Sequence, residues 1–306
     1  MASLFAQRIV QAALILLGVA LVTFLLLHYL PADPAALIAG RSANAQMIAN
    51  VRHQLGLDLP LPLQFWRYLS GLLRGDLGRS YIQRSEVATL IVARIPATLV
   101  LMLTGILVEV ALGLVFGILA AVKRNGFADR AVMTLAFVGV SSPQFVIALL
   151  LLYVFAAELG WFPMSGYGTP AHVVLPALTL GLLGAGWYAR MVRSAMIDVL
   201  NQDYVRTARA KGLSWRRVIL RHALPNALLP IVAMIGIDIG QFMGGVVVVE
   251  AVYGWPGIGQ LAWQAIQQVD VPIIMGVTLV SSLAIVLGNL LADAVAPVLD
   301  PRIRGR

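Results

Sequence analysis

Six long apolar runs dominate the pattern of hydrophobic and polar positions along this chain. Each run is about 20 residues or longer, enough to cross a bilayer as a helix that rises about 1.5 Å per residue. The runs predict an all-α polytopic membrane protein with six transmembrane helices, at residues 9–30, 99–122, 131–157, 173–191, 227–249 and 273–296. The first run exceeds the apolar core of a cleaved signal peptide, about 7 to 15 residues. This length favours an uncleaved signal anchor.

Prolines fall inside two of these runs. Pro143 lies within the third run, and Pro176 lies near the start of the fourth. Proline is tolerated in membrane helices because neighbours or water can satisfy the freed carbonyls. Pro143 therefore predicts a kink in the third helix rather than a break.

Residues 31–96 contain no run long enough to span a membrane. Apolar residues recur there at helical spacing in three places. They are Met47, Ile48, Val51 and Leu55, then Trp66, Leu69 and Leu73, then Val87, Leu90 and Ile91 behind a Ser85–Glu86 helix start. The repeated period favours several short amphipathic helices on one membrane face over an irregular loop.

Composition agrees with the membrane class. The chain has 306 residues, of which 60% are hydrophobic and 12% are charged. Soluble domains carry about 25% charged residues, so this chain has too little polar surface for a soluble globule of its size. It has no cysteine, which excludes disulfides, thiolate metal sites and cysteine nucleophiles.

The positions of the charges predict the orientation. Of the 22 Lys and Arg residues, seven lie in residues 31–96, and the other 15 lie at the N-terminus, after the second and fourth runs, or in the C-terminal tail. The loops at 158–172 and 250–272 have none. Because short cytoplasmic loops collect Lys and Arg, both termini are predicted to lie in the cytoplasm and residues 31–96 outside. Topology thus accounts for the net charge of +8 without nucleic-acid binding.

Several kinds of catalytic site are missing from the sequence. No G-x-x-x-x-G-K-[ST] phosphate loop, H-E-x-x-H helix or G-x-S-x-G elbow occurs, and the four histidines are scattered. The chain is therefore predicted to be no enzyme and to hold no cofactor or metal of its own.

A basic insert at residues 201–226 separates the fourth and fifth runs. Asp203 can cap a helix over 204–211 that Gly212 ends, and Ser214 can cap a second helix over 215–224 that Pro225 ends. A slim helix with a sharp glycine stop suits a groove on a partner protein. The alternative is an ordinary basic loop that touches anionic lipid headgroups.

The insert resembles the E-A-A motif of the inner-membrane permeases of ABC importers. Arg206, Thr207 and Ala208 stand at the E-A-A position, Gly212 follows after three residues, and Leu224 begins the Leu-Pro pair. Arg206 replaces the usual Glu. Five other stretches are similar to the dipeptide, oligopeptide, nickel and glutathione branch: residues 28–40, 54–60, 75–80, 249–259 and 300–304.

The resemblance implies a type I importer permease in the bacterial inner membrane. A homologous second permease would complete the pathway, two cytoplasmic ATPase subunits or domains would bind ATP and Mg, and a periplasmic or lipid-anchored substrate-binding protein would deliver short peptides, glutathione or chelated nickel. The resemblance also implies a coupling helix at 203–212 that fits the ATPase. Its expected contact residues are Asp203, Tyr204, Arg206, Thr207, Ala208, Arg209, Lys211 and Gly212. The chain is expected to divide into three parts. These are an N-terminal transmembrane helix with a periplasmic amphipathic segment at residues 1–96, a five-helix permease core at 97–297 and a cytoplasmic tail at 298–306.

Four acids lie in or at the ends of the apolar runs: Glu109, Asp238, Glu250 and Asp293. Charges at this depth are costly and usually face a cavity or a partner. Glu109 and Asp238 are mid-span and are the first candidates for a polar substrate pathway. Glu250 is a further candidate, although a structural role is favoured for it and for Asp293. Tyr253 and Trp255, in an outward Gly-rich segment, are candidates by resemblance, with a plain turn as the alternative. A stand-alone channel or secondary carrier that uses these acids is the alternative function.

Overall fold

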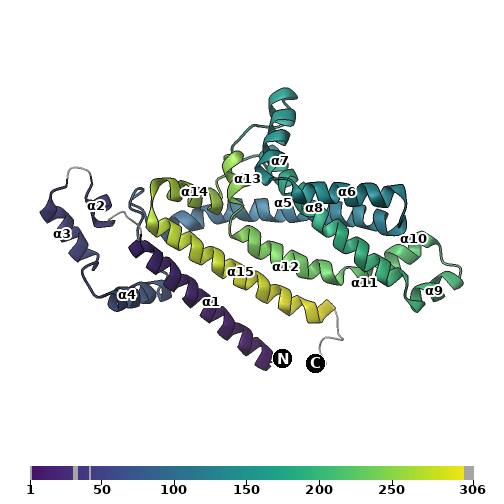
Figure 1. The fold of residues 1–306 in the computed structure, drawn as a ribbon, viewed down its shortest axis with the longest axis horizontal. Helices are drawn as coiled ribbons and strands as arrows, with labels where there is room; N and C mark the ends of the chain where they lie inside the picture. The colour runs from purple at the N-terminus through teal and green to yellow at the C-terminus, as the bar shows by residue number, and fades with distance from the viewer. Residues whose placement is uncertain (1, 30–33, 41–42, 300–306) are drawn as a thin grey trace.

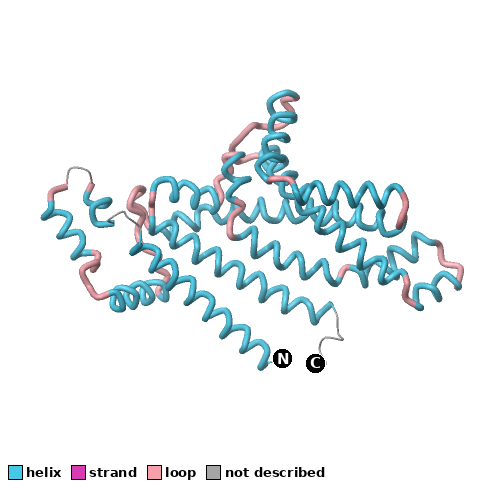
Figure 2. Tube along the Cα trace, viewed as in Figure 1, coloured by secondary structure: helices cyan, strands magenta, loops and turns pink. Residues whose placement is uncertain are grey.

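The protein is a bundle of long helices with a smaller group of short helices at one end (Figure 1). The structure is a computed structural model that describes residues 2–29, 34–40 and 43–299. Among these residues the ordered elements are helices, with one isolated β-bridge between Arg79 and Glu86 (Figure 2). The all-helical prediction is confirmed.

Four helices are individually long and apolar enough to cross a membrane. They are α1 (Ala2–Tyr29), α5 (Val87–Val122), α8 (Pro170–Leu200) and α15 (Val271–Leu299). Two bent pairs bring the number of candidate spans to six. One is α6 (Phe127–Ser141) with α7 (Gln144–Leu151) and the π-helix η1 (Leu152–Glu158). The other is the helical run Trp215–Ala227 with α12 (Leu229–Met243).

The centre of the bundle is the pair α5 and α8, which pack through glycines. A Cβ on Gly117 would lie 2.6 Å from Val192 Cβ, and one on Gly113 would collide with Tyr188. A Cβ on Gly181 of α8 would likewise collide with the side chain of Val108 of α5. Small residues let membrane helices approach closely, which is how they gain packing energy in lipid.

The short helices α2 (Pro34–Ala39), α3 (Ala45–Gln54) and α4 (Leu61–Leu73) lie at the end of the bundle opposite α9 (Asp203–Ala210). The amphipathic helices predicted around Met47 and Trp66 are thereby confirmed. Phe24 of α1 packs against Phe65 and Tyr68 of α4, with ring centroids 5.3 and 5.9 Å apart. This aromatic cluster fixes α4 on the end of α1.

The third amphipathic helix, predicted behind Ser85–Glu86, is not separate. It is the first part of α5, which runs without interruption through Pro96. The span predicted to begin at residue 99 therefore begins at Val87, and the expected boundary at residues 96/97 lies inside this helix. Proline removes one helical hydrogen bond, and the buried contacts of Val87, Ile91 and Ala97 on either side hold the helix together.

Pro143 breaks its span, so the prediction of a kink is wrong. The two halves meet at 104°. α7 packs against α8 and α13, and the segment formed by α7 and η1 points out from the long axis of the bundle (Figure 1). Ser142, just before the proline, has an extended backbone with ψ of 134°, as proline favours in the preceding residue. The Ser142 hydroxyl also donates to the Val138 carbonyl at 2.7 Å, which gives a partner to one carbonyl in the last turn of α6.

The fifth predicted span is too long. Instead of reaching residue 249, α12 ends at Met243, and a turn at Gly244–Gly245 leads into α13 (Val247–Val252) and α14 (Ile258–Gln268). Gly245 has φ of +90°, and a Cβ there would lie 2.5 Å from Gly259 N. Both the left-handed backbone and this close approach require glycine.

Candidate functional site

The basic insert forms a compact helical hairpin at one end of the bundle (Figure 1). It consists of α9, α10 (Trp215–Arg217), the π-helix η2 (Val218–Ala223) and α11 (Leu224–Ala227). Gly212 has φ of +77°, so the glycine stop predicted for the first helix is present. Asp203 is the first residue of α9, and Gln202 takes the N-cap position instead.

Pro225 does not end the second helix of the insert, contrary to the prediction. It is the second residue of α11, which follows directly on the π-helix η2. The helical run therefore continues to Ala227 and bends by 50° into α12. As a result, the insert is connected to a membrane span by nearly continuous helix.

One face of α9 packs against the protein itself. Val205 and Ala208 are 1% and 6% exposed and contact Val218 of η2. Ala208, expected to contact a partner, therefore points inward. Leu213 completes this small core, which fixes α9 relative to the helix that follows.

The other face of α9 is free to meet a partner. Its exposed residues are Asp203, Tyr204, Arg206, Thr207, Arg209, Ala210, Lys211 and Gly212. Arg206 Nη1 lies 3.4 Å from Asp203 Oδ1. The Arg209 guanidinium lies over the Trp215 ring, 4.9 Å from its centroid. The face thus carries three cations and one acid around a tyrosine that is 44% exposed.

A second site lies within the bundle, where Glu109 of α5 and Asp238 of α12 line one cavity of about 470 Å³. The structure thus brings together the two acids predicted to line a pathway. Glu109 is 3% exposed and packs directly against Gly184 of α8, where any side chain would collide with its carboxylate. Tyr188 of α8 donates its hydroxyl proton to Asp238 Oδ2.

The cavity also contains polar residues that the sequence reading missed. They are Ser142 and Gln144 at the break between α6 and α7, Trp187 and Tyr188 on α8, and Gln241 on α12. The Arg190 guanidinium lies over the Trp187 ring at 4.3 Å from its centroid. Gln144 and Gln241 are uncharged polar residues within apolar runs, a signal that could have pointed to the cavity.

Glu250 lies elsewhere and has a buried structural environment. Its Oε2 accepts the Gln260 N–H at 2.8 Å, and its Oε1 accepts the Thr98 hydroxyl at 3.3 Å. Thr98 Oγ1 in turn accepts the Ile258 N–H at 2.9 Å. Because a carboxylate stabilises the free N–H groups of a helix start, Glu250 and Thr98 together cap α14.

Tyr253 and Trp255 are 2% and 1% exposed and belong to the main core rather than to the cavity. The Trp255 Nε1–H donates to the Ala97 carbonyl at 2.9 Å, and the Tyr253 hydroxyl donates to the Ala148 carbonyl at 3.0 Å. These bonds connect the segment after α13 to α5 and α7. The side chain of Asp293, the fourth acid, lies outside the described residues.

No group of three metal-ligating side chains occurs in the part of the chain that the structure describes. The exposed face of α9 is a charged surface, and the space lined by Glu109 and Asp238 is a polar cavity.

The chain matches two protein families along nearly its whole length. Residues 113–305 match the inner membrane component of binding-protein-dependent transport systems, and residues 1–102 match the N-terminal region of such membrane components.

Curated relatives are similar over almost their full length. The chain is 47% identical over 289 residues to the glutathione transport system permease protein GsiC of Salmonella paratyphi A. It is 46% identical over 286 residues to the GsiC protein of Escherichia coli strain K12. Each alignment covers 94% of this chain and 94% of the relative.

A solved structure has the same fold in the core. An inward-facing form of the MetNI methionine ABC transporter aligns with a TM-score of 0.57 and 23% identity. The alignment covers 69% of this chain and 96% of the transporter chain.

Proposed function

The chain belongs to the family of inner membrane components of binding-protein-dependent transport systems, and from this we propose that its ABC importer carries glutathione or a related short peptide. The chain is the permease subunit of that importer. The observation that carries the proposed substrate is the similarity to glutathione permeases over 94% of both chains.

The cavity between α5, α8 and α12 supports a peptide-like solute. Glu109 and Asp238 offer negative charge, and Arg190, stacked on Trp187, offers positive charge nearby. Glutathione carries both an ammonium group and carboxylates. Its ammonium group could pair with Glu109 or Asp238, and a carboxylate could pair with Arg190. The break at Pro143 also lines this cavity, and non-helical backbone at membrane depth is tolerated where it is buried in protein or lines a water-filled space.

The assembly follows the logic of the family. A second, homologous permease completes the pathway, two ATPase subunits or domains bind ATP and Mg, and a binding protein delivers the solute. With each bent pair counted as one span, the chain would cross the inner membrane six times, with both termini and α9 in the cytoplasm; the distribution of Lys and Arg supports this orientation.

The exposed face of α9 is the proposed contact with the ATPase. Its small core with Val218 supports this role, because a movement of α9 would be passed through η2 and α11 to α12. Arg206 stands beside Asp203 on that face, at the position where the motif usually has a Glu. The ATPase surface that contacts Arg206 is therefore expected to carry an acid.

Transport by the complete complex tests the substrate. The chain, reconstituted in liposomes with its second permease, ATPases and binding protein, should take up labelled glutathione only when ATP is present. Uptake of a dipeptide in place of glutathione would reassign the substrate, and flux through the isolated chain without nucleotide would instead support a channel or carrier.

Two variants of the exposed face test coupling. Thr207→Glu and Ala210→Glu place a new charge on the surface of α9, and we expect ATP-driven uptake to be lost while membrane insertion is unchanged. Asn226→Glu, on the exposed surface of α11, is the control. Ala208→Glu is unsuitable because Ala208 is buried. Normal uptake by both α9 variants would refute the coupling role.

Asp238→Asn tests the pathway. It removes the charge but keeps the size of the side chain, so we expect reduced glutathione uptake with intact ATPase assembly. Glu250→Gln serves as a comparison, since the packing of Glu250, Tyr253 and Trp255 supports a structural role for all three. Equal uptake by Asp238→Asn and wild type would remove this acid from the pathway.

A further inference from the structure

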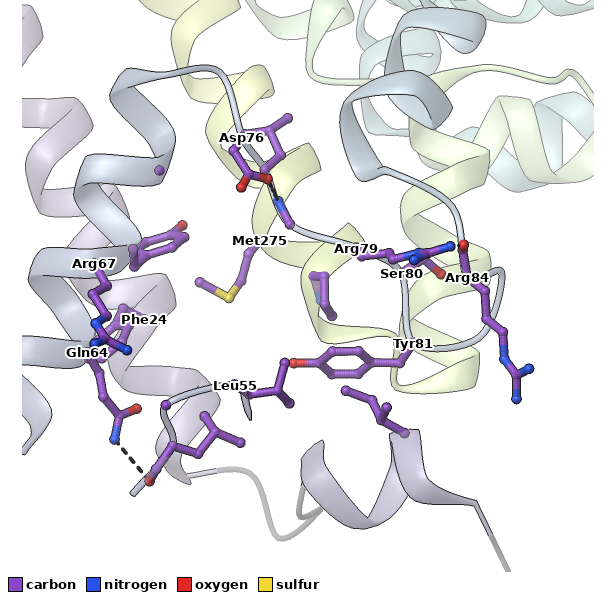
Figure 3. A pocket seen from close by; sticks show the side chains of 18 residues that line it. Phe24, Leu55, Gln64, Arg67, Asp76, Arg79, Ser80, Tyr81, Arg84 and Met275 are labelled. Atoms are coloured by element: carbon purple, nitrogen blue, oxygen red, sulfur yellow. Dashed lines mark hydrogen bonds between the residues drawn. The ribbon is translucent and has the colours of Figure 1, made fainter. Parts of the chain in front are cut away.

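A large cavity lies at the end of the bundle opposite α9 and plays no part in the proposed transport. Its volume is about 740 Å³, and its walls come from α1, α4, the loop at residues 74–86 and the start of α15 (Figure 3). Apolar side chains such as Phe24, Leu55 and Met275 form much of the wall. The cavity therefore combines an apolar interior with charged side chains from α4 and from the loop at residues 74–86.

The charge at this cavity is strongly positive. Arg67, Arg79 and Arg84 line it, against one acid, Asp76. Asp76 Oδ1 accepts the Gly78 N–H at 2.8 Å, and Arg79 Nε donates to the Arg84 carbonyl at 2.7 Å. Among the described residues, none of the three arginines forms an ion pair, so their outer N–H groups are available to an anion.

The arginine loop is held in place by a buried acid. Asp270 accepts the Ser80 hydroxyl at 2.5 Å and the Ile82 N–H at 3.2 Å, and Asp270 is 1% exposed. Tyr81 extends from the same loop across the cavity toward Leu55 (Figure 3). Burial and the Asp270 carboxylate raise the pKa of Tyr81 to about 12, so its hydroxyl remains a neutral donor at pH 7.

An apolar groove continues from the cavity along the membrane helices. It lies between α1 and α15, has a volume of about 530 Å³, and shares Met275 with the cavity. A Cβ on Gly18 in this groove would meet no atom within 4 Å. The groove runs from Ile15 to Leu26, about 16 Å of helix, or roughly half of a 30 Å hydrocarbon core.

We propose that the cavity and groove bind one anionic phospholipid, with the phosphate at Arg67, Arg79 and Arg84 and an acyl chain between α1 and α15. Guanidinium groups bind phosphate oxygens through paired, charge-assisted bonds. The change from a cationic cavity to an apolar groove of one leaflet's depth matches an amphipathic molecule better than a free anion. Such a lipid would fill the space between α1 and the rest of the bundle.

Lipid retention by the purified full-length chain tests this site. Phosphatidylglycerol is titrated into detergent micelles of the protein, and bound lipid is counted by native mass spectrometry. Arg67→Gln/Arg84→Gln should weaken binding about fivefold per arginine removed. Arg52→Gln/Arg74→Gln, with the same charge change on the same segment but outside the cavity, should bind like wild type. Matching melting temperatures verify that all variants are folded.

A second variant tests the groove without changing charge. Gly18→Leu places a side chain in the open space beside α1, and we expect it to weaken phosphatidylglycerol binding while the arginines are intact. Inorganic phosphate should compete poorly with the lipid. The proposal is overturned if both arginine doubles bind lipid equally, or if Gly18→Leu has no effect while inorganic phosphate competes fully. It is also overturned if Arg67→Gln/Arg84→Gln binds phosphatidylglycerol like wild type but, in the complete complex, no longer binds the substrate-binding protein. That result would make the cavity a protein-docking surface.

Discussion

Removing the arginine of the buried ion pair between α6 and α8 should destabilise the protein strongly. Arg193 Nε lies 2.5 Å from Asp129 Oδ1, and Nη2 lies 2.7 Å from Oδ2. The Asp129 side chain is 4% exposed and also accepts the Asn125 N–H at 2.8 Å. Arg193→Met would leave this carboxylate buried without its paired guanidinium.

The size of the effect follows from burial. Breaking one partner of a buried pair costs about 3–5 kcal/mol, whereas replacing both partners by apolar residues is often neutral. The Arg193 side chain is 26% exposed, so water can reach part of the site and we expect the lower value, about 3 kcal/mol for Arg193→Met. Asp129→Leu/Arg193→Met should recover most of this loss.

Equilibrium unfolding of the purified chain in mixed micelles, followed by circular dichroism, measures these differences. Arg130→Met is the control, because Arg130 is the next residue along α6 and its side chain is exposed. The reasoning fails if Arg193→Met unfolds like the control, or if the double variant is no more stable than Arg193→Met alone.

Three further variants test the packing described above. Gly117→Val should lower the free energy of unfolding by about 1–3 kcal/mol through overpacking against Val192, whereas Gly18→Ala, which meets no atom, should lower it little. Glu250→Gln loses one acceptor at the start of α14 and should cost about 1–3 kcal/mol in the same assay, with Glu86→Gln, an exposed acid, as the control. Trp255→Phe removes the bond to the Ala97 carbonyl and should cost about 1 kcal/mol with unchanged solute specificity; a change of specificity would return Trp255 to the pathway.

The sequence was informative wherever a long apolar run or a glycine stop decided the structure. The positions of α1, α8 and α15 followed from run length, and the end of α9 followed from Gly212. The prolines were misread because their effect depends on tertiary contacts. Pro96 lies inside an intact helix since buried residues flank it, whereas the residue before Pro143, Ser142, has an extended backbone and α6 ends there.

The site was predictable only in part for the same reason. Periodicity placed Glu109 and Asp238 within spans, but the shared cavity depends on how α5, α8 and α12 pack. Likewise, Val205 and Ala208 share one face of α9, but the sequence does not show whether that face meets a partner protein or the chain itself. The inward direction of Ala208 depends on its contact with Val218. Tyr253 and Trp255 were pathway candidates by resemblance, and their place in the core could not be predicted because the folding of α13 and α14 onto the core is a long-range event.

The course of α7 and η1 away from the bundle bears on how a cell must produce this subunit. A copy of the chain without the proposed second permease would leave the break at Pro143 uncovered on one side, where Phe145, Leu149 and Tyr153 are each more than half exposed. Irregular backbone beside lipid is unfavourable, so such orphan copies should be recognised and degraded by membrane proteases. The dosage of the partner, rather than of this chain, would then set how many importers accumulate.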